Sequence, residues 1–306
     1  MNANQPTIFF SGGGTGGHLF PGLAVADALA DCLPGVQIGF LGTRRGFEER
    51  HIRPHGYRYI AVPAHPVPRS APAAIRFVRD YARGLRQARR ELRRHQAVAV
   101  IGLGGYASVP GVRAALGLEI PAVILEQNVV PGRANRWLAR AGAAVFAAFN
   151  ESRTWFSRRA DFHWTGTPVR RQVAALATGA PPERPTAPGM KKHRPTLLVM
   201  GGSQGARSLN DAVPRAVVML PELRGWRVVH QTGPADACRT RAAYEAESVW
   251  AETIDFLDDV AAAYARADLV ICRAGGATLA ELACAGLPAL LVPYPHAASD
   301  HQRRNA

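Results

Sequence analysis

The first residues whose types and spacing could do chemistry form a glycine-rich run that ends in a histidine, Ser11-Gly12-Gly13-Gly14-Thr15-Gly16-Gly17-His18. The run follows an apolar segment, and Pro21 lies near the start of a helical pattern. Glycine lets the backbone approach a ligand closely, and a helix N-terminus presents free N–H groups and positive potential. The alternative is a tight strand-to-helix turn, which needs fewer glycines. We therefore favour a ligand site.

Comparable turns recur along the chain. Gly102-Leu103-Gly104-Gly105-Tyr106 and Glu126-Gln127-Asn128 follow apolar segments in the first half, and Gly201-Gly202-Ser203-Gln204-Gly205 follows one in the second half. Arg273-Ala274-Gly275-Gly276-Ala277-Thr278 then opens a helical pattern that contains Glu281. A diphosphate at that helix N-terminus would be held by N–H groups and the helix dipole, and Glu281 could accept hydrogen bonds from ribose hydroxyls. The alternative is that Glu281 only complements the dipole.

The spacing Gly12-x-Gly14-x-x-Gly17 also matches the dinucleotide fingerprint of dehydrogenases. That fingerprint requires an acid at the end of the second strand to hold the ribose. Here the corresponding segment ends in Leu41-Gly42-Thr43-Arg44-Arg45, which could serve only a 2′-phosphate. A dehydrogenase would also leave the second half of the chain unexplained, so this alternative is weaker.

These turns need strands and helices to position them, and the sequence alternates the two. Apolar runs predict strands at 7–11, 36–42, 57–62, 97–102, 122–126 and 143–149, and again at 196–202, 226–231, 253–257, 268–272 and 289–293. Helical patterns occupy intervening segments such as 19–33 and 134–141. Consecutive apolar positions are typical of parallel strands buried on both faces. The fold class is therefore α/β, with two Rossmann-like domains whose parallel sheets face one another across a cleft.

The pattern is interrupted once, by a proline-rich stretch at 179–195 that contains five prolines. Such composition is typical of a linker or loop. We expect a first domain at 1–167, a linker with its proline-rich loop at 168–195, and a second domain at 196–306.

Composition narrows the class of partner. The formal net charge is +14, which attracts nucleic acid, anionic lipid or phosphorylated substrates. No nucleic-acid module is visible, so we expect no nucleic-acid partner. The four cysteines form no CxxC pair, which argues against a zinc site or a disulfide framework. The N-terminus lacks the pattern of a secretory signal, and no apolar run is long enough to span a bilayer.

Much of the positive charge lies in one predicted helix, 72–94. Between Arg69 and Arg94 there are nine arginines and two acids, Asp80 and Glu91. An apolar stripe (Val78, Tyr81, Leu85, Ala88, Leu92) runs beside an arginine stripe (Arg79, Arg83, Arg86, Arg90, Arg93). We expect the apolar stripe to face the core and the arginines to meet anionic lipid headgroups or a substrate diphosphate. The loop that carries Val67, with Ile75 beyond it, could dip into the membrane surface.

Taken together, these motifs resemble the MurG family in order and context. The resemblance rests on Gly13-Gly14-Thr15-Gly16-Gly17-His18, Gly104-Gly105-Tyr106, Glu126-Gln127-Asn128, Gly202–Arg207, Cys272-Arg273-x-Gly275 and His301-Gln302, and it runs over essentially the whole chain. It implies the GT-B fold and an inverting, metal-independent transfer of N-acetylglucosamine. The donor would be UDP-N-acetylglucosamine, and the acceptor lipid I, undecaprenyl-diphosphate-N-acetylmuramoyl-pentapeptide. It also implies a peripheral protein on the cytoplasmic face of the inner membrane, without a cofactor.

The resemblance assigns roles to residues at matching positions. His18 would be the general base, with a positioned hydrogen-bond donor as the alternative. Gly14 and Tyr106 would lie near the acceptor. Residues for UDP-N-acetylglucosamine would be Thr15, Gly16, Gly17, Asn128, Arg170, Ser203, Leu257, Gly276, Ala277, Thr278, Leu279, Ala280, Glu281 and Gln302. Helix dipoles would stabilise the departing diphosphate, so no essential metal is expected.

Two features depart from the family pattern. The sequence ends at Ala306, where the resemblance implies several tens of further residues that would complete the second domain. We therefore expect a truncated form, and a non-catalytic sugar-nucleotide-binding protein is the alternative function. The loop after His65 and the insertion at 181–192 are also atypical, which affects the acceptor contacts expected there.

Overall fold

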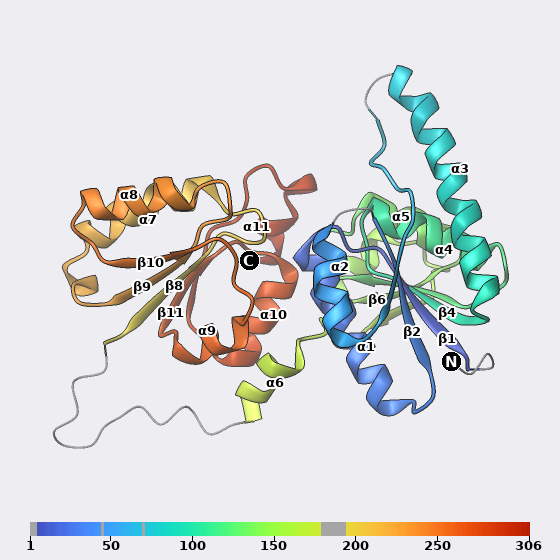
Figure 1. The fold of residues 1–306 in the computed structure, drawn as a ribbon, viewed down its shortest axis with the longest axis horizontal. Coiled ribbons are helices and arrows are strands. Elements are labelled where there is room, and N and C mark those ends of the chain that lie inside the picture. The colour runs from blue at the N-terminus through green and yellow to red at the C-terminus, as the bar shows by residue number, and fades with distance from the viewer. Residues whose placement is uncertain (1–4, 44–45, 69–70, 179–193) are drawn as a thin grey trace. The chain divides into compact units, whose positions relative to one another are not determined.

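The structure is a computed structural model, and it describes residues 5–43, 46–68, 71–178 and 194–306. The chain divides into two compact units, Met1–Pro168 with Ala298–Asn305, and Val169–Ala297. Each unit is a parallel sheet with helices around it (Figure 1). The predicted α/β class is confirmed.

The first unit is built on a seven-stranded sheet in the order β3-β2-β1-β4-β5-β6-β7, and every pair of neighbours is parallel. Its strands are β1 (Thr7–Ser11), β2 (Gln37–Gly42), β3 (Arg58–Ala61), β4 (Ala97–Gly102), β5 (Ala122–Glu126), β6 (Ala144–Ala147) and β7 (Phe162–Trp164). The central strand β1 is buried along its whole length. Phe9 and Phe10 point to opposite faces and belong to separate core clusters. Burying each ring contributes about 2 kcal/mol.

The helices of the first unit are α1 (Gly16–Cys32), α2 (Gly46–Ile52), α3 (Ala71–Arg94), α4 (Val109–Leu116), α5 (Arg133–Arg140) and α11 (His301–Asn305). Short 3-10 helices are η1 (Arg53–His55), η2 (Tyr106–Ser108), η3 (Asn150–Trp155) and η5 (Ala298–Asp300). Helix α1 begins directly after the glycine turn, three residues before the predicted start at Leu19. The turn and the helix therefore form one continuous strand-to-helix connection.

Helix α3 packs on the unit through its C-terminal part only. Ala88 and Leu92 are fully buried, whereas Ile75 and Val78 are 77% and 61% exposed. The prediction that the whole apolar stripe faces the core was therefore wrong for Val78. The helix crosses the segment after β3 at Gly84, where a Cβ would lie 2.2 Å from the Pro63 carbonyl oxygen. Its N-terminal part extends away from the body of the unit (Figure 1).

The second unit has a five-stranded parallel sheet in the order β10-β9-β8-β11-β12. Its strands are β8 (Thr196–Met200), β9 (Arg227–Gln231), β10 (Ala251–Ile254), β11 (Leu269–Cys272) and β12 (Ala289–Leu291). Its helices are α6 (Arg171–Thr178), α7 (Arg207–Met219), α8 (Ala237–Ala246), α9 (Val260–Arg266) and α10 (Gly276–Ala285), with the 3-10 helix η4 (Pro221–Leu223). Consecutive residues of the central strand β8 again belong to different core clusters, Leu198 to one and Leu197 to the other.

Some predicted boundaries differ from the structure. Residues 255–257 were predicted as strand, but β10 ends at Ile254, and the carbonyl oxygen of the next residue, Asp255, accepts a hydrogen bond from the side chain of Gln231 in the neighbouring strand β9. The predicted linker 168–195 contains helix α6, which packs on α9 and α10. The insertion at 181–192 lies outside the described residues. None of the helices within the described ranges is long and apolar enough to cross a bilayer.

Candidate functional site

In the first unit, the turns after β1 and β4 pack on one another. Gly12, Gly13 and Gly14 all have positive φ, at 118°, 136° and 76°, which disfavours any residue with a Cβ. A Cβ on Gly12 would lie 3.1 Å from the Gly104 carbonyl oxygen. The Ser11 hydroxyl, at the end of β1, donates to the Ser108 carbonyl oxygen at 3.1 Å. The glycines are therefore required to bring these two strand ends together.

His18 packs against the turn that follows β4. It is the third residue of α1, and a Cβ on Gly104 would lie 2.9 Å from its Cδ2 atom. Thr15 Oγ1 and His18 Nδ1 are 3.1 Å apart, so the threonine hydroxyl can set the tautomer of the ring. Burial, and to a smaller extent the nearby His301, lower the pKa of His18 to about 4. The ring is consequently neutral at pH 7 and able to accept a proton.

The end of β5 supplies a buried carboxylate that organises the following loop. Glu126 is 3% exposed, and burial raises its pKa although four hydrogen bonds oppose this. One oxygen accepts from the backbone and side-chain amides of Asn128 at 3.0 and 3.1 Å, and the other accepts from Gly132 N and Asn135 Nδ2 at 3.0 and 2.9 Å. Asn128 is thereby fixed at the carboxyl end of the sheet.

Asn128 also contacts a residue far away in sequence. Asn305 donates through Nδ2 to Asn128 Oδ1 at 3.0 Å, and its Oδ1 accepts from Val129 N at the same distance. Gln302, predicted to serve the donor, lies in the same helix α11 and groups with the first unit. Tyr106 begins η2, directly after the Gly104-Gly105 turn. Asn305 was missed, because no sequence signal joins residues 177 positions apart.

The Gly14 amide is engaged within the chain. Gly14 N–H donates to Oε1 of Glu48 at 2.6 Å, and Glu48 is fully buried. This amide is therefore not available to an acceptor diphosphate in this conformation, although Gly14 was predicted to lie near one. Glu48 could not be predicted from the sequence, because the dinucleotide fingerprint requires an acid at the strand end itself. Here the acid comes six residues after β2, in α2.

In the second unit, one side chain ties together the ends of three strands. Gln231, the last residue of β9, donates through Nε2 to the carbonyl oxygens of Gly202 at 2.9 Å and Asp255 at 3.0 Å. A Cβ on Gly205 would lie 2.0 Å from the Thr232 carbonyl oxygen, so only glycine fits there. Ser203, predicted to meet the diphosphate or uridine, is partly exposed in this turn.

Helix α10 begins at Gly276, and its N-cap residue Gly275 carries no side chain that could cap the first turn. Five residues further on, Glu281 is 6% exposed and accepts a bidentate ion pair from Arg170, with Nε to Oε1 at 2.7 Å and Nη2 to Oε2 at 2.9 Å. Tyr264 O–H donates to Oε2 at 3.4 Å. Burial raises the pKa of Tyr264 and Glu281 raises it further, so the phenol stays protonated.

The structure thus brings Arg170 and Glu281 together, although the resemblance assigned them separate roles at the nucleotide. Leu257 follows β10 and packs against the core near Tyr264. The remaining predicted donor residues form the first turns of α10, namely Gly276, Ala277, Thr278, Leu279 and Ala280. In the first unit, Thr15, Gly16, Gly17 and His18 belong to the start of α1 and its N-cap.

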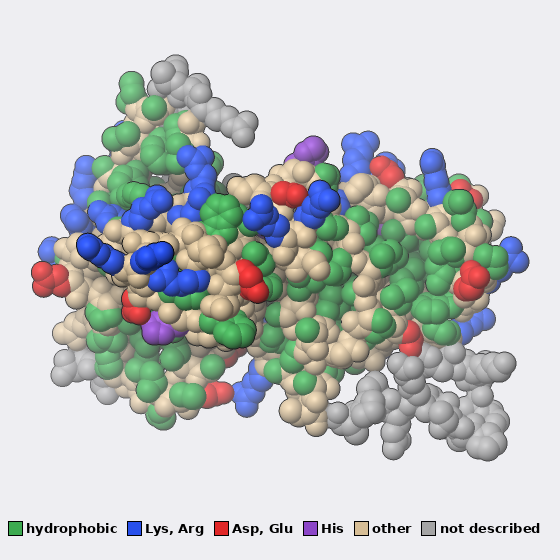
Figure 2. Space-filling view, turned by 180° about the vertical axis from the view of Figure 1, so that it is seen from behind, with side chains coloured by type: hydrophobic (Ala, Val, Ile, Leu, Met, Phe, Trp, Pro, Cys, Tyr) green, Lys and Arg blue, Asp and Glu red, His purple; other side chains and the backbone are tan. Residues whose placement is uncertain are grey.

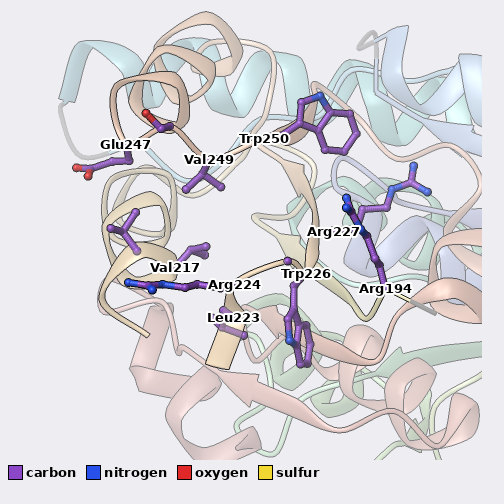
Figure 3. A pocket seen from close by; sticks show the side chains of 12 residues that line it. Arg194, Val217, Leu223, Arg224, Trp226, Arg227, Glu247, Val249 and Trp250 are labelled. Carbon is purple, nitrogen blue, oxygen red and sulfur yellow. The ribbon is translucent and has the colours of Figure 1, made fainter. Parts of the chain in front are cut away.

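The second unit also has a pocket of about 620 Å³, which was not predicted. It is lined by Arg194, Arg224, Arg227, Trp226 and Trp250 among others, at the amino ends of β9 and β10 (Figure 3). Ligands of open parallel sheets bind at the carboxyl ends of the strands, where the glycine turns lie. This pocket is therefore separate from the candidate site. In the described part of the chain, no group of three or more His, Cys, Asp or Glu residues could hold a metal.

Comparisons with known proteins agree with this organisation. Residues 8–147 match the glycosyltransferase family 28 N-terminal domain, and residues 196–306 match the C-terminal domain of that family. The chain is 42% identical, over 98% of its length and 81% of the relative, to the UDP-N-acetylglucosamine--N-acetylmuramyl-(pentapeptide) pyrophosphoryl-undecaprenol N-acetylglucosamine transferase of Trichlorobacter lovleyi. A relative of the same name from Syntrophotalea carbinolica is 43% identical, with the same two coverages.

Among solved structures, MurG of Acinetobacter baumannii is 31% identical with a TM-score of 0.68, over 98% of this chain and 81% of that one. The two Rossmann-like units and both domain matches define the GT-B class of glycosyltransferases. Within that class, the chain belongs to the MurG family of glycosyltransferase family 28. It spans about four fifths of the length of these relatives.

Proposed function

We propose that this protein transfers N-acetylglucosamine from UDP-N-acetylglucosamine to lipid I, forming lipid II for peptidoglycan synthesis. The observation that carries the proposal is 42% identity over 98% of the chain to a transferase of that name. The site agrees with it, because a neutral histidine lies at the carboxyl edge of the first sheet and an open helix N-terminus at that of the second. Such a reaction contributes to the cell wall, and hence to cell shape and division.

In the proposed reaction, the acceptor hydroxyl attacks the anomeric carbon of the donor sugar. A new C–O bond forms as the bond to the β-phosphate oxygen breaks, so the anomeric centre inverts and UDP leaves with the electron pair. His18 takes the hydroxyl proton, which its neutral ring allows at pH 7. The first-turn N–H groups of α10 stabilise the charge that develops on the departing diphosphate, and we predict no essential metal.

The donor is assigned mainly to the second unit. Gly276–Ala280 would hold the phosphates and uridine, with Ser203 and Leu257 beside them. Glu281 would accept from the ribose through Oε1, which keeps a lone pair after binding Arg170, whereas Oε2 accepts from both Arg170 and Tyr264. Arg170 orients that carboxylate. From the first unit, Thr15, Gly16, Gly17, Asn128 and Gln302 would contact the sugar, and Tyr106 would lie near the acceptor.

We further propose that α3 docks the protein on anionic membrane, at the cytoplasmic face of the inner membrane where lipid I is held. The helix carries eight arginines against two acids. Every one of the arginines is exposed, whereas the side chains of Asp80 and Glu91 are 14% and 8% exposed. Exposed Val67, Ile75 and Val78 add apolar contact. Figure 2 shows apolar side chains at the projecting end of this unit and cationic side chains below it. This pattern suits anionic headgroups.

The transfer is tested by following UDP release from UDP-N-acetylglucosamine with a lipid I analogue. We expect His18→Gln to lower kcat at least about 100-fold, as for loss of a general base, and to leave donor affinity in calorimetry within about twofold. The matched control is His163→Gln, an exposed histidine beside Asp161 in the same unit. Donor binding by the wild type without UDP release would instead support a non-catalytic sugar-nucleotide-binding protein.

Membrane docking is tested by vesicle flotation. We expect the wild type to float with vesicles that contain anionic phospholipid and to stay unbound with neutral ones, because the exposed charge of α3 is positive. Equal binding to both kinds of vesicle would refute the electrostatic part of the proposal.

A further inference from the structure

The buried carboxylate of Glu48 has no part in the roles assigned so far, yet its environment is specific. Its Oε1 accepts from Gly14 N at 2.6 Å. Its Oε2 accepts from Thr43 N at 2.5 Å, from Thr43 Oγ1 at 3.0 Å and from Tyr59 O–H at 2.8 Å. The single Tyr59 hydroxyl proton is shared between Oε2 and the Thr43 carbonyl oxygen, and burial together with Glu48 raises the pKa of the phenol. Every partner of this carboxylate is a donor, so the ionised form is fully satisfied.

The backbone around Glu48 is shaped to admit the carboxylate. A Cβ on Gly13 would lie 2.9 Å from Oε1, and a Cβ on Gly42 would lie 2.7 Å from Oε2. Glycines at these two positions, one after β1 and one at the end of β2, therefore leave the space that the carboxylate fills. A buried charge is tolerated only when it is bonded on all sides, as here. The site is thus built for a carboxylate and not merely filled by one.

The bonds of Glu48 have a direct consequence for the glycine turn. N–H groups of a glycine-rich turn before a helix attract anions, and here an anion from α2 already occupies the Gly14 amide. Gly12 is held separately, because its N–H donates to the Leu41 carbonyl oxygen at 2.9 Å. The Glu48 bond therefore acts on Gly13 and Gly14, which have positive φ and no side chains. Thr15 follows immediately, and its Oγ1 contacts His18 Nδ1. The carboxylate therefore anchors the turn one residue before the Thr15–His18 pair.

We propose that Glu48 is a positioning residue for the transfer reaction, which holds the glycine turn so that Thr15 and His18 stand correctly. The inference rests on the proposed function for its catalytic part. Glu48 does not touch substrate, and it acts through the turn. An amide cannot replace it, because either orientation of a glutamine would point N–H groups at Gly14 N–H or at Thr43 N–H.

The first test is independent of activity. Hydrogen exchange of the peptide that covers residues 12–15 is measured by mass spectrometry in protein without substrate, for the wild type, Glu48→Gln and Glu48→Asp. The matched control is Glu49→Gln, which removes the same charge from the same helix but only breaks a pair with exposed Arg53. We expect exchange in this peptide to accelerate about tenfold in the Glu48 variants, with the control unchanged.

The second test measures kcat for UDP release and donor affinity in the same proteins. We expect Glu48→Gln to lower kcat about tenfold or more, because misplacement of a catalytic group by a fraction of an ångström is costly. Donor affinity stays within about twofold, since the donor phosphates are assigned to the second unit. If Glu48→Gln does not fold, Glu48→Asp carries the test, because it keeps the charge but is one methylene too short to reach both amides.

The outcomes separate the two proposals. Unchanged exchange in a folded Glu48 variant, or faster exchange with wild-type kcat, would overturn the role of Glu48. A fall in kcat that Glu49→Gln shares would overturn it as well, because the effect would then be general to α2. The wild-type protein is assayed in parallel with the variants, because a wild type without transferase activity would refute the proposed function instead.

Discussion

The pH dependence of transfer tests the assignment of His18 most directly. Burial lowers its pKa from the ordinary 6.5 to about 4, a difference worth about 3 kcal/mol between the two protonation states. The neutral ring that accepts the proton is therefore present above about pH 4 and is lost as pH falls through that value. An unperturbed histidine would already lose it near pH 6.5.

The two cases differ most between pH 5 and 6. At pH 5.5 a histidine with a pKa of about 4 is about 97% neutral, whereas one at 6.5 is only about 9% neutral. We therefore expect kcat/KM, which reports the free enzyme, to stay level from pH 8 to pH 5 and to bend near pH 4. Bound acceptor diphosphate favours the protonated ring, so the bend in kcat lies at higher pH.

The assay is UDP release over pH 4 to 8, with folding monitored by circular dichroism at each pH. His230 is the matched control, because burial also lowers its pKa to about 4, but it lies inside the second unit. His18→Gln should remove most of the activity, and the activity that remains should no longer fall near pH 4. His230→Gln should keep the fall of kcat/KM near pH 4. A wild-type bend in kcat/KM near pH 6.5 would refute the assignment.

Three further predictions concern stability and docking. Arg170→Met leaves the Glu281 carboxylate buried without its ion pair, so the free energy of unfolding of the second unit should fall by about 3–5 kcal/mol in chemical denaturation. An unchanged denaturation midpoint would argue against a buried charge. The pKa of His230 is lowered in the folded state, so its contribution to the free energy of unfolding is complete above about pH 6.5 and is lost toward pH 4. His230→Gln should flatten the fall of the thermal unfolding midpoint between pH 6.5 and pH 4. An equally steep fall in the variant would contradict the assignment. The double change Ile75→Asp and Val78→Asp should cut flotation on anionic vesicles at least about tenfold while transfer to a water-soluble acceptor stays at the wild-type rate, and unaltered flotation would exclude this apolar contact.

The sheets could be predicted well from sequence because burial on both faces leaves a direct signature. Strands such as Thr7–Ser11 and Thr196–Met200 are apolar runs that glycine turns follow, and both were located correctly. Boundaries that depend on one tertiary contact could not be predicted. Strand β10 ends at Ile254, and the next carbonyl oxygen, that of Asp255, accepts from the side chain of Gln231 in β9, a contact that no local pattern reveals. The short edge strand β7 was also missed, since three residues carry too little pattern.

In the candidate site too, features with a local sequence signal could be predicted, whereas contacts between residues distant in sequence could not. The placement of residues such as His18 and Gly276 at helix starts could be predicted, because the local sequence itself creates the turns that precede them. Residues that act across the fold could not be predicted. Glu48 reaches a turn 34 residues away, and Asn305 contacts Asn128 across 177 positions. A polar residue in a short helix has no local feature that reveals such a partner.

The bond between Arg170 and Glu281 has a mechanical consequence. Arg170 lies two residues after Pro168, where the first unit ends, and it is followed at once by α6. Its guanidinium binds Glu281 of helix α10 through two parallel hydrogen bonds, and α6 packs on the same helix. While this ion pair is intact, the residues directly after Pro168 form one rigid piece with the helix that is assigned to UDP.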